Sequence, residues 1–212
     1  IAGLWVYALD TSNDALLNWV STNYTSTQTN MTFTAREGFT GNGSSSFINS
    51  NYVPSTQTNT GQTNIAVHFY TRSRSAGGFN DFGGRSGFGA PRNSIRVNTA
   101  GETSFATLNN ATSPAAGIVS SGLTGLHTIS RIDNSDQIAY RNGAVEGTLS
   151  QNTNGQPTVT MYFAGFNAGG AVSASSDGQY AMGAITEGMT GAEVSDFNTR
   201  VTTLLTAFNA TV

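Results

Sequence analysis

A glycine-rich segment in the first half of the chain carries the side chains best suited to chemistry. It reads RSRSAGGFNDFGGRSGFGAPRN and spans residues 72–93. Aromatic faces pack on the apolar side of a sugar ring, whereas Asp, Asn and Arg bond its hydroxyls and Gly lets the backbone approach closely. A second loop, NAGGAVSASSDG, spans residues 167–178. The ligand contacts that these two loops predict are Phe79, Asn80, Asp81, Phe82, Arg85 and Asn167.

Both loops also have a purely structural interpretation. The first is equally typical of a β-hairpin that turns its phenylalanines into a core and places Gly in its turn. Period-two alternation puts Phe79 and Phe82 on opposite faces of such a hairpin, so they do not both face one side. Asn167 in the second loop is typical of a residue that ends a strand. The sequence leaves a binding surface and a core hairpin open for the first loop.

Catalytic groups are sparse and badly spaced. A glycosidase needs two carboxylates that flank the scissile bond. Glu102 and Glu146 stand alone, and no strand carries a cluster of acidic residues. Only His68 and His127 could serve as the base of a serine triad, and no nucleophile elbow accompanies them. We therefore expect a non-enzymatic protein, with a glycan hydrolase as the less favoured alternative.

One acidic turn offers oxygen ligands for a metal ion. Calcium prefers several oxygen ligands, and the segment RIDNSDQ supplies Asp133 and Asp136. An Asx-rich turn between two strands explains the same residues and is the favoured interpretation. The chain has no Cys, which excludes disulfides and thiolate metal sites. We expect no cofactor, with calcium as the option that remains open.

Charge and hydropathy exclude two classes of partner. The formal net charge is -3, and the cations are nine scattered Arg residues with no Lys. Nucleic-acid binding needs clustered cations, so we expect no nucleic-acid partner. No apolar run is long enough for membrane insertion. The chain begins IAGLWVYALD, without Met, and is expected to be part of a longer polypeptide.

Short strands must position these loops. In residues 64–72, NIAVHFYTR, the apolar side chains of Ile65, Val67 and Phe69 alternate with those of Ala66, His68 and Tyr70. This alternation is the pattern of a half-buried strand. Residues 136–150 predict a hairpin that turns at Asn142 and Gly143. Such strands recur about every ten residues with turn signals between them, which is typical of a sandwich or jelly roll. We expect one domain over 1–212, with a lead-in segment over about 1–30.

Two helices frame the strands. A short one is expected within LDTSNDALLNWV, residues 9–20, capped by Ser12 or Asn13. The second is amphipathic and spans 190–208, where Thr190 and Glu193 have capping-box spacing. Its apolar face must cover either the back of the sandwich or a neighbouring subunit.

The order of several motifs resembles one family. FTGNGSSSFIN, then HTISRIDNSDQIAYRNGAV, then the closing stretch from MYFAGF to LLTAF follow one another as in concanavalin A-like, laminin-G-like domains of bacteriophage virion proteins. The resemblance spans nearly the whole chain. It implies an all-β, concanavalin A-like jelly-roll β-sandwich with a short N-terminal helix and a C-terminal amphipathic helix.

The same resemblance implies a setting rather than an activity, because one fold hosts many functions. Such domains occur in tail fibres, receptor-binding proteins and virion decorations. The implied location is the virion surface or tail, and the implied assembly is a homo-oligomer. The leading hypothesis is recognition of a host-surface glycan or receptor. The alternative is a structural or decoration module that binds other virion proteins.

Overall fold

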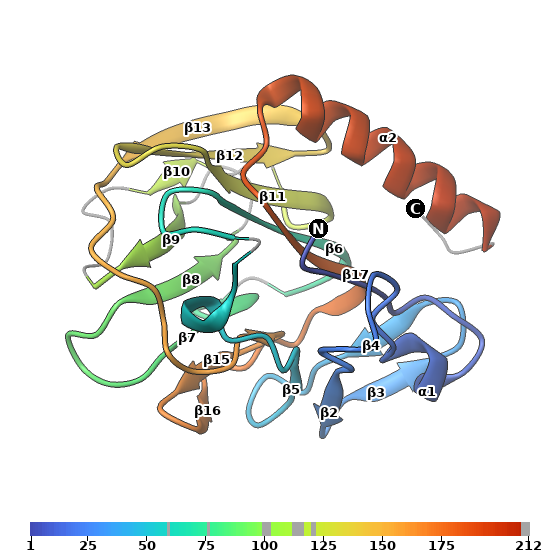
Figure 1. Cartoon of the computed structure of the whole chain (residues 1–212). Helices are drawn as coiled ribbons and strands as arrows, with labels where there is room; N and C mark the ends of the chain where they lie inside the picture. The colour runs from blue at the N-terminus through green and yellow to red at the C-terminus, as the bar shows by residue number, and fades with distance from the viewer. Residues whose placement is uncertain (59, 76, 99–102, 112–116, 120–121, 209–212) are drawn as a thin grey trace.

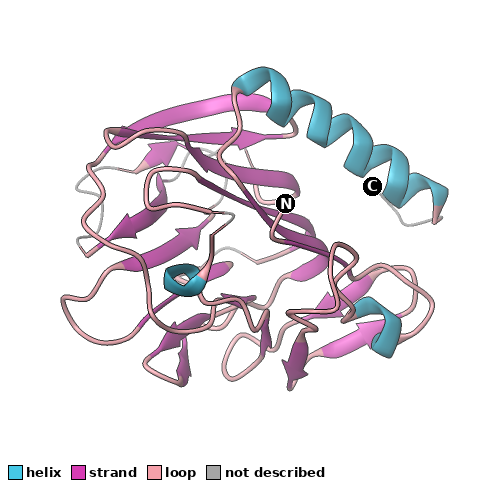
Figure 2. Cartoon of the chain, in the orientation of Figure 1, coloured by secondary structure: helices cyan, strands magenta, loops and turns pink. Residues whose placement is uncertain are grey.

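Two antiparallel sheets make up most of the molecule (Figures 1 and 2). The computed structural model describes residues 1–212 except 59, 76, 99–102, 112–116, 120–121 and 209–212. The first sheet has the order β13-β12-β11-β6-β17-β4-β3, with β1 also paired to β17. Its strands are β1 Gly3–Val6, β3 Thr32–Thr34, β4 Gly38–Thr40, β6 Ile65–Ser73, β11 Gly125–Arg131, β12 Asp136–Arg141, β13 Ala144–Ser150 and β17 Gln179–Thr186.

The second sheet has the order β10-β9-β8-β7-β14-β5-β2. Strand β15 pairs with β16 and, in parallel, with β7. The strands of this sheet are β2 Thr27–Thr29, β5 Phe47–Asn49, β7 Phe82–Arg85, β8 Arg92–Arg96, β9 Thr103–Asn110, β10 Ile118–Val119, β14 Tyr162–Phe163, β15 Phe166–Ala168 and β16 Ala171–Ser173. The helical elements are α1 Ser12–Ala15, a 3-10 turn Pro54–Thr56 and α2 Gly191–Ala207. The predicted all-β jelly-roll-like sandwich with two helices is confirmed.

The main core lies between the two sheets. Trp5, Phe39, Phe82 and Phe163 are fully buried there and belong to one apolar cluster. Their rings meet edge-on or tilted, as in the Phe82–Phe163 pair with centroids 5.0 Å apart. Burying large aromatic side chains removes the most apolar area per residue from water, so these rings dominate the stability of the sandwich.

The outer face of the first sheet is covered as well. Strand β6 is buried on both faces, whereas its alternating pattern predicted one half-exposed face. Val201 and Leu205 of α2 pack in a second apolar cluster with Tyr70 of β6 and Met182 of β17. Figure 1 shows α2 on the side of the first sheet that faces away from the second sheet. Of the two predicted locations for the helix, the structure has the back of the sandwich.

The N-terminus of α2 has the predicted capping box. Thr190 accepts a hydrogen bond from Glu193 N, and the Glu193 carboxylate accepts one from Thr190 N at 2.8 Å. We expect Thr190→Ala to lower the free energy of unfolding by about 1 kcal/mol, because a backbone N–H loses its partner. Urea denaturation measures this difference. Thr190→Ser keeps the hydroxyl and should stay close to the parent; an equally large loss in Thr190→Ser would argue against the capping role.

The first helix differs from its prediction. Helix α1 is capped by Thr11, not by Ser12 or Asn13, and it ends at Ala15, before Trp19. The Asn18 side chain accepts a bond from Leu4 N at 3.1 Å, and Trp19 N donates to Leu4 O at 2.8 Å. These bonds attach the chain to β1 and compete with further helix. No described helix is long and apolar enough to cross a membrane.

Candidate functional site

Asp81, a predicted ligand contact, lies inside the protein. Its side chain and that of Arg74 are both fully buried, and Arg74 Nη1 lies 2.7 Å from Asp81 Oδ2. The same oxygen accepts a bond from Val97 N at 2.9 Å, and Oδ1 accepts one from the Tyr180 hydroxyl at 2.6 Å. The carboxylate therefore has protein partners on both oxygens, and a ligand at the surface does not reach it.

The Asp81 network joins four parts of the fold. Arg74 follows β6, Asp81 precedes β7, Val97 follows β8 and Tyr180 lies on β17. Burial raises the pKa of the Asp81 carboxyl, while Arg74, Tyr180 and Val97 N–H all act in the opposite sense by stabilising the ionised form. Burial also raises the pKa of the Tyr180 phenol well above its usual value, which keeps the hydroxyl a donor. The network therefore links the first sheet, through Arg74 and Tyr180, to the second sheet, through Asp81 and Val97.

Two further predicted contacts are internal. The Phe82 ring is fully buried in the main core, as the hairpin interpretation required. The Asn167 side chain is also buried; its Nδ2 donates to Thr160 O at 2.8 Å, and its Oδ1 accepts from Gly170 N at 2.7 Å. Asn167 thus holds the turn between β15 and β16, in line with the strand-ending interpretation.

Phe79, Asn80 and Arg85 remain partly exposed, but they do not form one group. The Phe79 ring lies 5.9 Å from the Arg74 guanidinium, over the network that contains Asp81. Asn80 Oδ1 accepts a bond from Ser94 Oγ at 2.8 Å. Arg85 lies at the far end of β7, where the glycine-rich turn to β8 begins. The six predicted residues therefore divide into three internal side chains and three partly exposed ones, with Phe79 and Asn80 adjacent and Arg85 apart from them.

Arg85 is part of an aromatic arrangement that we call the Arg85–Phe88 platform, formed by Arg85, Phe88 and Phe166. The guanidinium lies 5.9 Å from the Phe88 ring centroid and 5.8 Å from that of Phe166. Phe166 is 6% exposed, whereas Phe88 is 99% exposed. Such cation–π geometry holds the guanidinium in place. Phe88 was not in the predicted set, although its position between Gly87 and Gly89 is a signal for an exposed turn.

The two glycine-rich loops meet at this platform. Strand β15 runs parallel to β7 with Ala168 opposite Arg85, and Gly169 N donates to Arg85 O at 2.9 Å. Gly89 has φ +76°, a left-handed conformation that favours glycine, and the space around it is open. The structure therefore places the second loop beside Arg85 of the first loop, although the Asn167 side chain itself points inward.

Both histidines are internal. His68 lies with Nδ1 2.9 Å from Thr128 Oγ1 and Nε2 3.0 Å from Thr186 Oγ1. His127 is stacked on Phe69, and its Nε2 lies 3.2 Å from Leu123 O. Burial lowers the pKa of each imidazole to about 3. Neither ring is accessible to a substrate.

The carboxylates of the acidic turn accept hydrogen bonds from nearby protein groups. Asp133 Oδ1 accepts bonds from Ser135 N at 2.7 Å and Asp136 N at 2.8 Å, which lower the pKa of that carboxyl. Asp136 Oδ1 accepts a bond from Ser150 Oγ at 2.7 Å. Asp133 therefore forms an Asx turn between β11 and β12. Within the described part of the chain, no three His, Cys, Asp or Glu side chains gather as metal ligands do.

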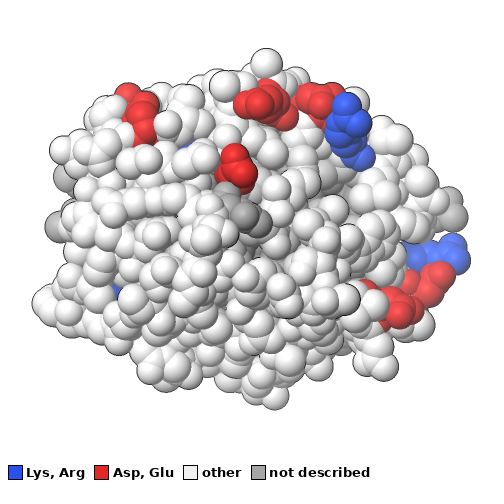
Figure 3. Space-filling model, in the orientation of Figure 1, with Lys and Arg blue, Asp and Glu red and all other residues white. Residues whose placement is uncertain are grey.

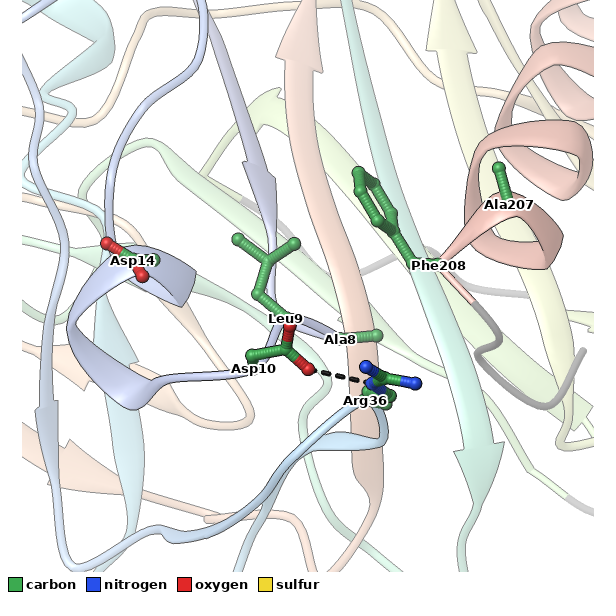
Figure 4. Close-up of a pocket in the computed structure, with 7 residues that line it drawn as sticks. All are labelled: Ala8, Leu9, Asp10, Asp14, Arg36, Ala207 and Phe208. Atoms are coloured by element: carbon green, nitrogen blue, oxygen red, sulfur yellow. Dashed lines mark hydrogen bonds and ion pairs between the residues drawn. The ribbon is translucent and has the colours of Figure 1, made fainter.

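A cavity lies where the C-terminal end of α2 meets the N-terminal segment (Figure 4). Its volume is about 390 Å³, and Arg36 Nε lies 2.7 Å from Asp10 Oδ1 at its edge. Both side chains are more than half exposed, so the pair is worth little to stability. Asp14, which also lines the cavity, accepts a hydrogen bond from Thr11 Oγ1 at 2.7 Å. Figure 3 shows that this side of the molecule carries few charges, in small scattered groups.

Comparisons with known proteins define the fold. Domain 4 of AbnA, a GH43 extracellular arabinanase from Geobacillus stearothermophilus solved with arabinotriose, aligns over 93% of this chain and 97% of that domain, with a TM-score of 0.63 and 13% identity. The chain has a jelly-roll-like β-sandwich fold. The botulinum neurotoxin serotype G binding domain aligns over 94% of this chain and 50% of that one, with a TM-score of 0.56 and 12% identity.

A third solved structure agrees with these two. A mutant of Trypanosoma rangeli sialidase that displays trans-sialidase activity aligns over 91% of this chain and 32% of that one, with a TM-score of 0.57 and 10% identity. At these identities the likeness concerns the fold alone. No protein-family model matches the sequence, and no curated protein matches it.

Proposed function

We propose that this chain is a non-enzymatic module of a phage virion protein that recognises a host-surface glycan through the Arg85–Phe88 platform. The observation that carries the proposal is the Phe88 ring, which is 99% exposed beside a guanidinium. Leaving a phenylalanine in water forgoes roughly 1.5–3 kcal/mol of burial. Nothing in the core requires an aromatic residue at this turn, so a ligand-facing role explains it.

The platform suits a neutral sugar. The exposed ring offers an apolar face for the axial hydrogens of a pyranose, and Arg85 offers N–H donors to its hydroxyls. Apart from the adjacent residues, no atom of the described residues lies within 4 Å of a Cβ position built at Gly87 or Gly89, so a bulky glycan has room on either side of the ring. Binding at such an open surface is weak, and many copies on one particle would multiply it.

Three further observations support the proposal. The arabinanase domain that shares this fold over nearly its whole length was solved with an oligosaccharide, arabinotriose. The order of the sequence motifs supports the virion setting. A non-enzymatic role agrees with the internal positions of Asp81, His68 and His127, which leave these groups without access to substrate.

Phe88→Ala tests the platform. We expect at least a tenfold weaker affinity for any glycan that the parent binds, because stacking on one aromatic ring is worth on the order of 1–3 kcal/mol. Glycan arrays identify the ligand, and isothermal titration calorimetry then compares the variants. Val145→Ala, at a side chain 63% exposed on β13, is the matched control and should bind like the parent. Unchanged affinity in both Phe88→Ala and Arg85→Gln would overturn the assignment of the site.

One observation favours a structural or decoration module instead. Leu17, Trp19 and Val20 are between 45% and 47% exposed, and the Trp19 ring meets Phe208 edge-on at 5.8 Å. Such an apolar surface is typical of protein–protein contact. If no glycan on the array binds, and if Trp19 becomes shielded from solvent in assembled particles, this second function is favoured. Release of reducing sugar from a bound glycan would favour a hydrolase.

A further inference from the structure

A second cavity lies on the outer face of the first sheet. Its volume is about 360 Å³, and it is built from β6, β11, β12 and β17. We call it the arginine cavity; the side chains that matter to its chemistry are Tyr70, Arg72, Thr124, Arg141 and Gln179. These residues come from four separate parts of the sequence, so no sequence motif predicts the cavity.

The alternation of β6 explains why Arg72 faces this cavity. Phe69 points into the main core, and His68 and Tyr70 point to the other face, which α2 covers. Arg72 is two residues further along, on the same face as Tyr70. Strand β6 thus carries an arginine toward the end of the face that α2 covers.

Arg72 has no hydrogen-bond or ion-pair partner among the described residues. Its Nη1 is nevertheless shielded from solvent. Arg36, Arg74 and Arg200 by contrast each pair with a carboxylate. A shielded donor without an acceptor is unfavourable in a folded protein, and more so when it is charged. Arg72 lines the cavity, so an anionic ligand bound there would place an oxygen acceptor beside its side chain.

Arg141 faces the same cavity in a fixed orientation. Its Nε donates to Thr124 O at 2.7 Å. A Cβ atom at Gly122 would come within 2.9 Å of Arg141 Nη2, so the guanidinium lies directly against the Gly122 backbone. This arrangement leaves little freedom to the planar group, and a preorganised guanidinium loses less entropy when it binds an anion.

The described lining contains no carboxylate. The nearby Glu37 accepts a bond from Gln179 Nε2 at 3.1 Å and is not part of the lining. Burial raises the pKa of the Tyr70 phenol, and Arg72 and Arg141 both oppose that shift. The two positive charges therefore act on the same hydroxyl. Two guanidinium groups in one concave site are unusual in a chain whose formal net charge is -3.

We propose that the arginine cavity binds an oxyanion carried by a sugar-sized polar molecule. Guanidinium groups bind carboxylate and phosphate oxygens in pairs of parallel hydrogen bonds. Tyr70 and Gln179 provide further polar groups for the hydroxyls of the same molecule. The volume is near the lower end of the range of about 300–1,000 Å³ for ligand sites, which fits one sugar ring. The shared chemistry is that of a sugar acid or a sugar phosphate.

This site does not depend on the Arg85–Phe88 platform. The cavity belongs to the first sheet and the platform to the second. Failure of one site therefore leaves the other untouched, and Phe88→Ala should retain the anion affinity of the parent.

Three glucose derivatives test the proposal on the intact chain. Two-dimensional NMR titrations with glucose, glucuronate and glucose 6-phosphate at low salt compare the same ring with no charge, a carboxylate and a phosphate. We expect binding of at least one anion and none of glucose at the same concentrations. Arg72→Gln should weaken that binding roughly tenfold, the effect of losing a charge-assisted bond. The preferred anion distinguishes a sugar acid from a sugar phosphate.

The control variant is Arg200→Gln, which removes the same charge from an exposed ion pair on α2. It should bind the anion like the parent. Arg72→Gln should melt at or above the temperature of the parent, because it removes a shielded donor that has no acceptor among the described residues. The proposal is overturned if glucose binds as well as both anions, if Arg72→Gln retains full affinity, or if Arg200→Gln loses as much.

Discussion

Asp81→Ala is expected to lower the free energy of unfolding by about 3–5 kcal/mol, the usual cost of leaving one partner of a buried ion pair unpaired. The Arg74 side chain is as fully buried as that of Asp81, so water cannot replace the lost carboxylate without opening the structure. Val97 N and the Tyr180 hydroxyl lose their acceptor at the same time. Urea or guanidinium denaturation monitored by tryptophan fluorescence measures the loss.

Two variants separate the ion pair from its neighbours. Tyr180→Phe removes one hydrogen bond and should cost about 0.5–1.5 kcal/mol. The double variant Arg74→Met/Asp81→Leu removes both charges and should be more stable than Asp81→Ala alone, since no unpaired charge remains. A loss below 1 kcal/mol in Asp81→Ala would contradict the structural role. If Asp81→Ala abolished glycan binding but left stability unchanged, Asp81 would instead be a ligand contact.

Acid is expected to destabilise the protein well above the pH at which most carboxylates titrate. His68 and His127 have pKa values near 3 in the folded state, against about 6.5 in an unfolded chain. Between these values the unfolded state binds more protons, so stability is complete above about pH 6.5 and falls as pH falls toward 3. At pH 5 the loss is on the order of 2 kcal/mol for each histidine. Denaturant unfolding at pH 7.5 and pH 5 measures it.

Histidine replacements show whether these two rings cause the effect. His68→Gln keeps a polar side chain between Thr128 and Thr186 but cannot titrate, so it should reduce the loss between pH 7.5 and pH 5 by about half. Asp81, whose pKa burial raises, contributes in the opposite sense, which makes the comparison between variants the decisive one. An unchanged pH dependence in both His68→Gln and His127→Gln would exclude the histidines as its cause.

The sequence by itself determined the features that arise from local interactions. Asn142 and Gly143 form the predicted turn with φ of 50° and 81°, because few residues accept positive φ at adjacent positions. Thr190 and Glu193 cap α2 because the bonds involved span only three residues. The alternation in β6 and the spacing of the short strands likewise sufficed to predict an all-β sandwich.

Only the tertiary structure decided which candidate side chains lie inside the protein and which lie at its surface. Alternation separates two faces of a strand but does not say which one meets the core, and so Asp81 and Phe82 were included among the predicted contacts. Arg85 meets the second glycine-rich loop through the parallel pairing of β7 with β15, which joins segments about eighty residues apart. Arg72 and Arg141 share a cavity for the same reason: β6 and β12 are both neighbours of β11 in the sheet, which no local pattern encodes.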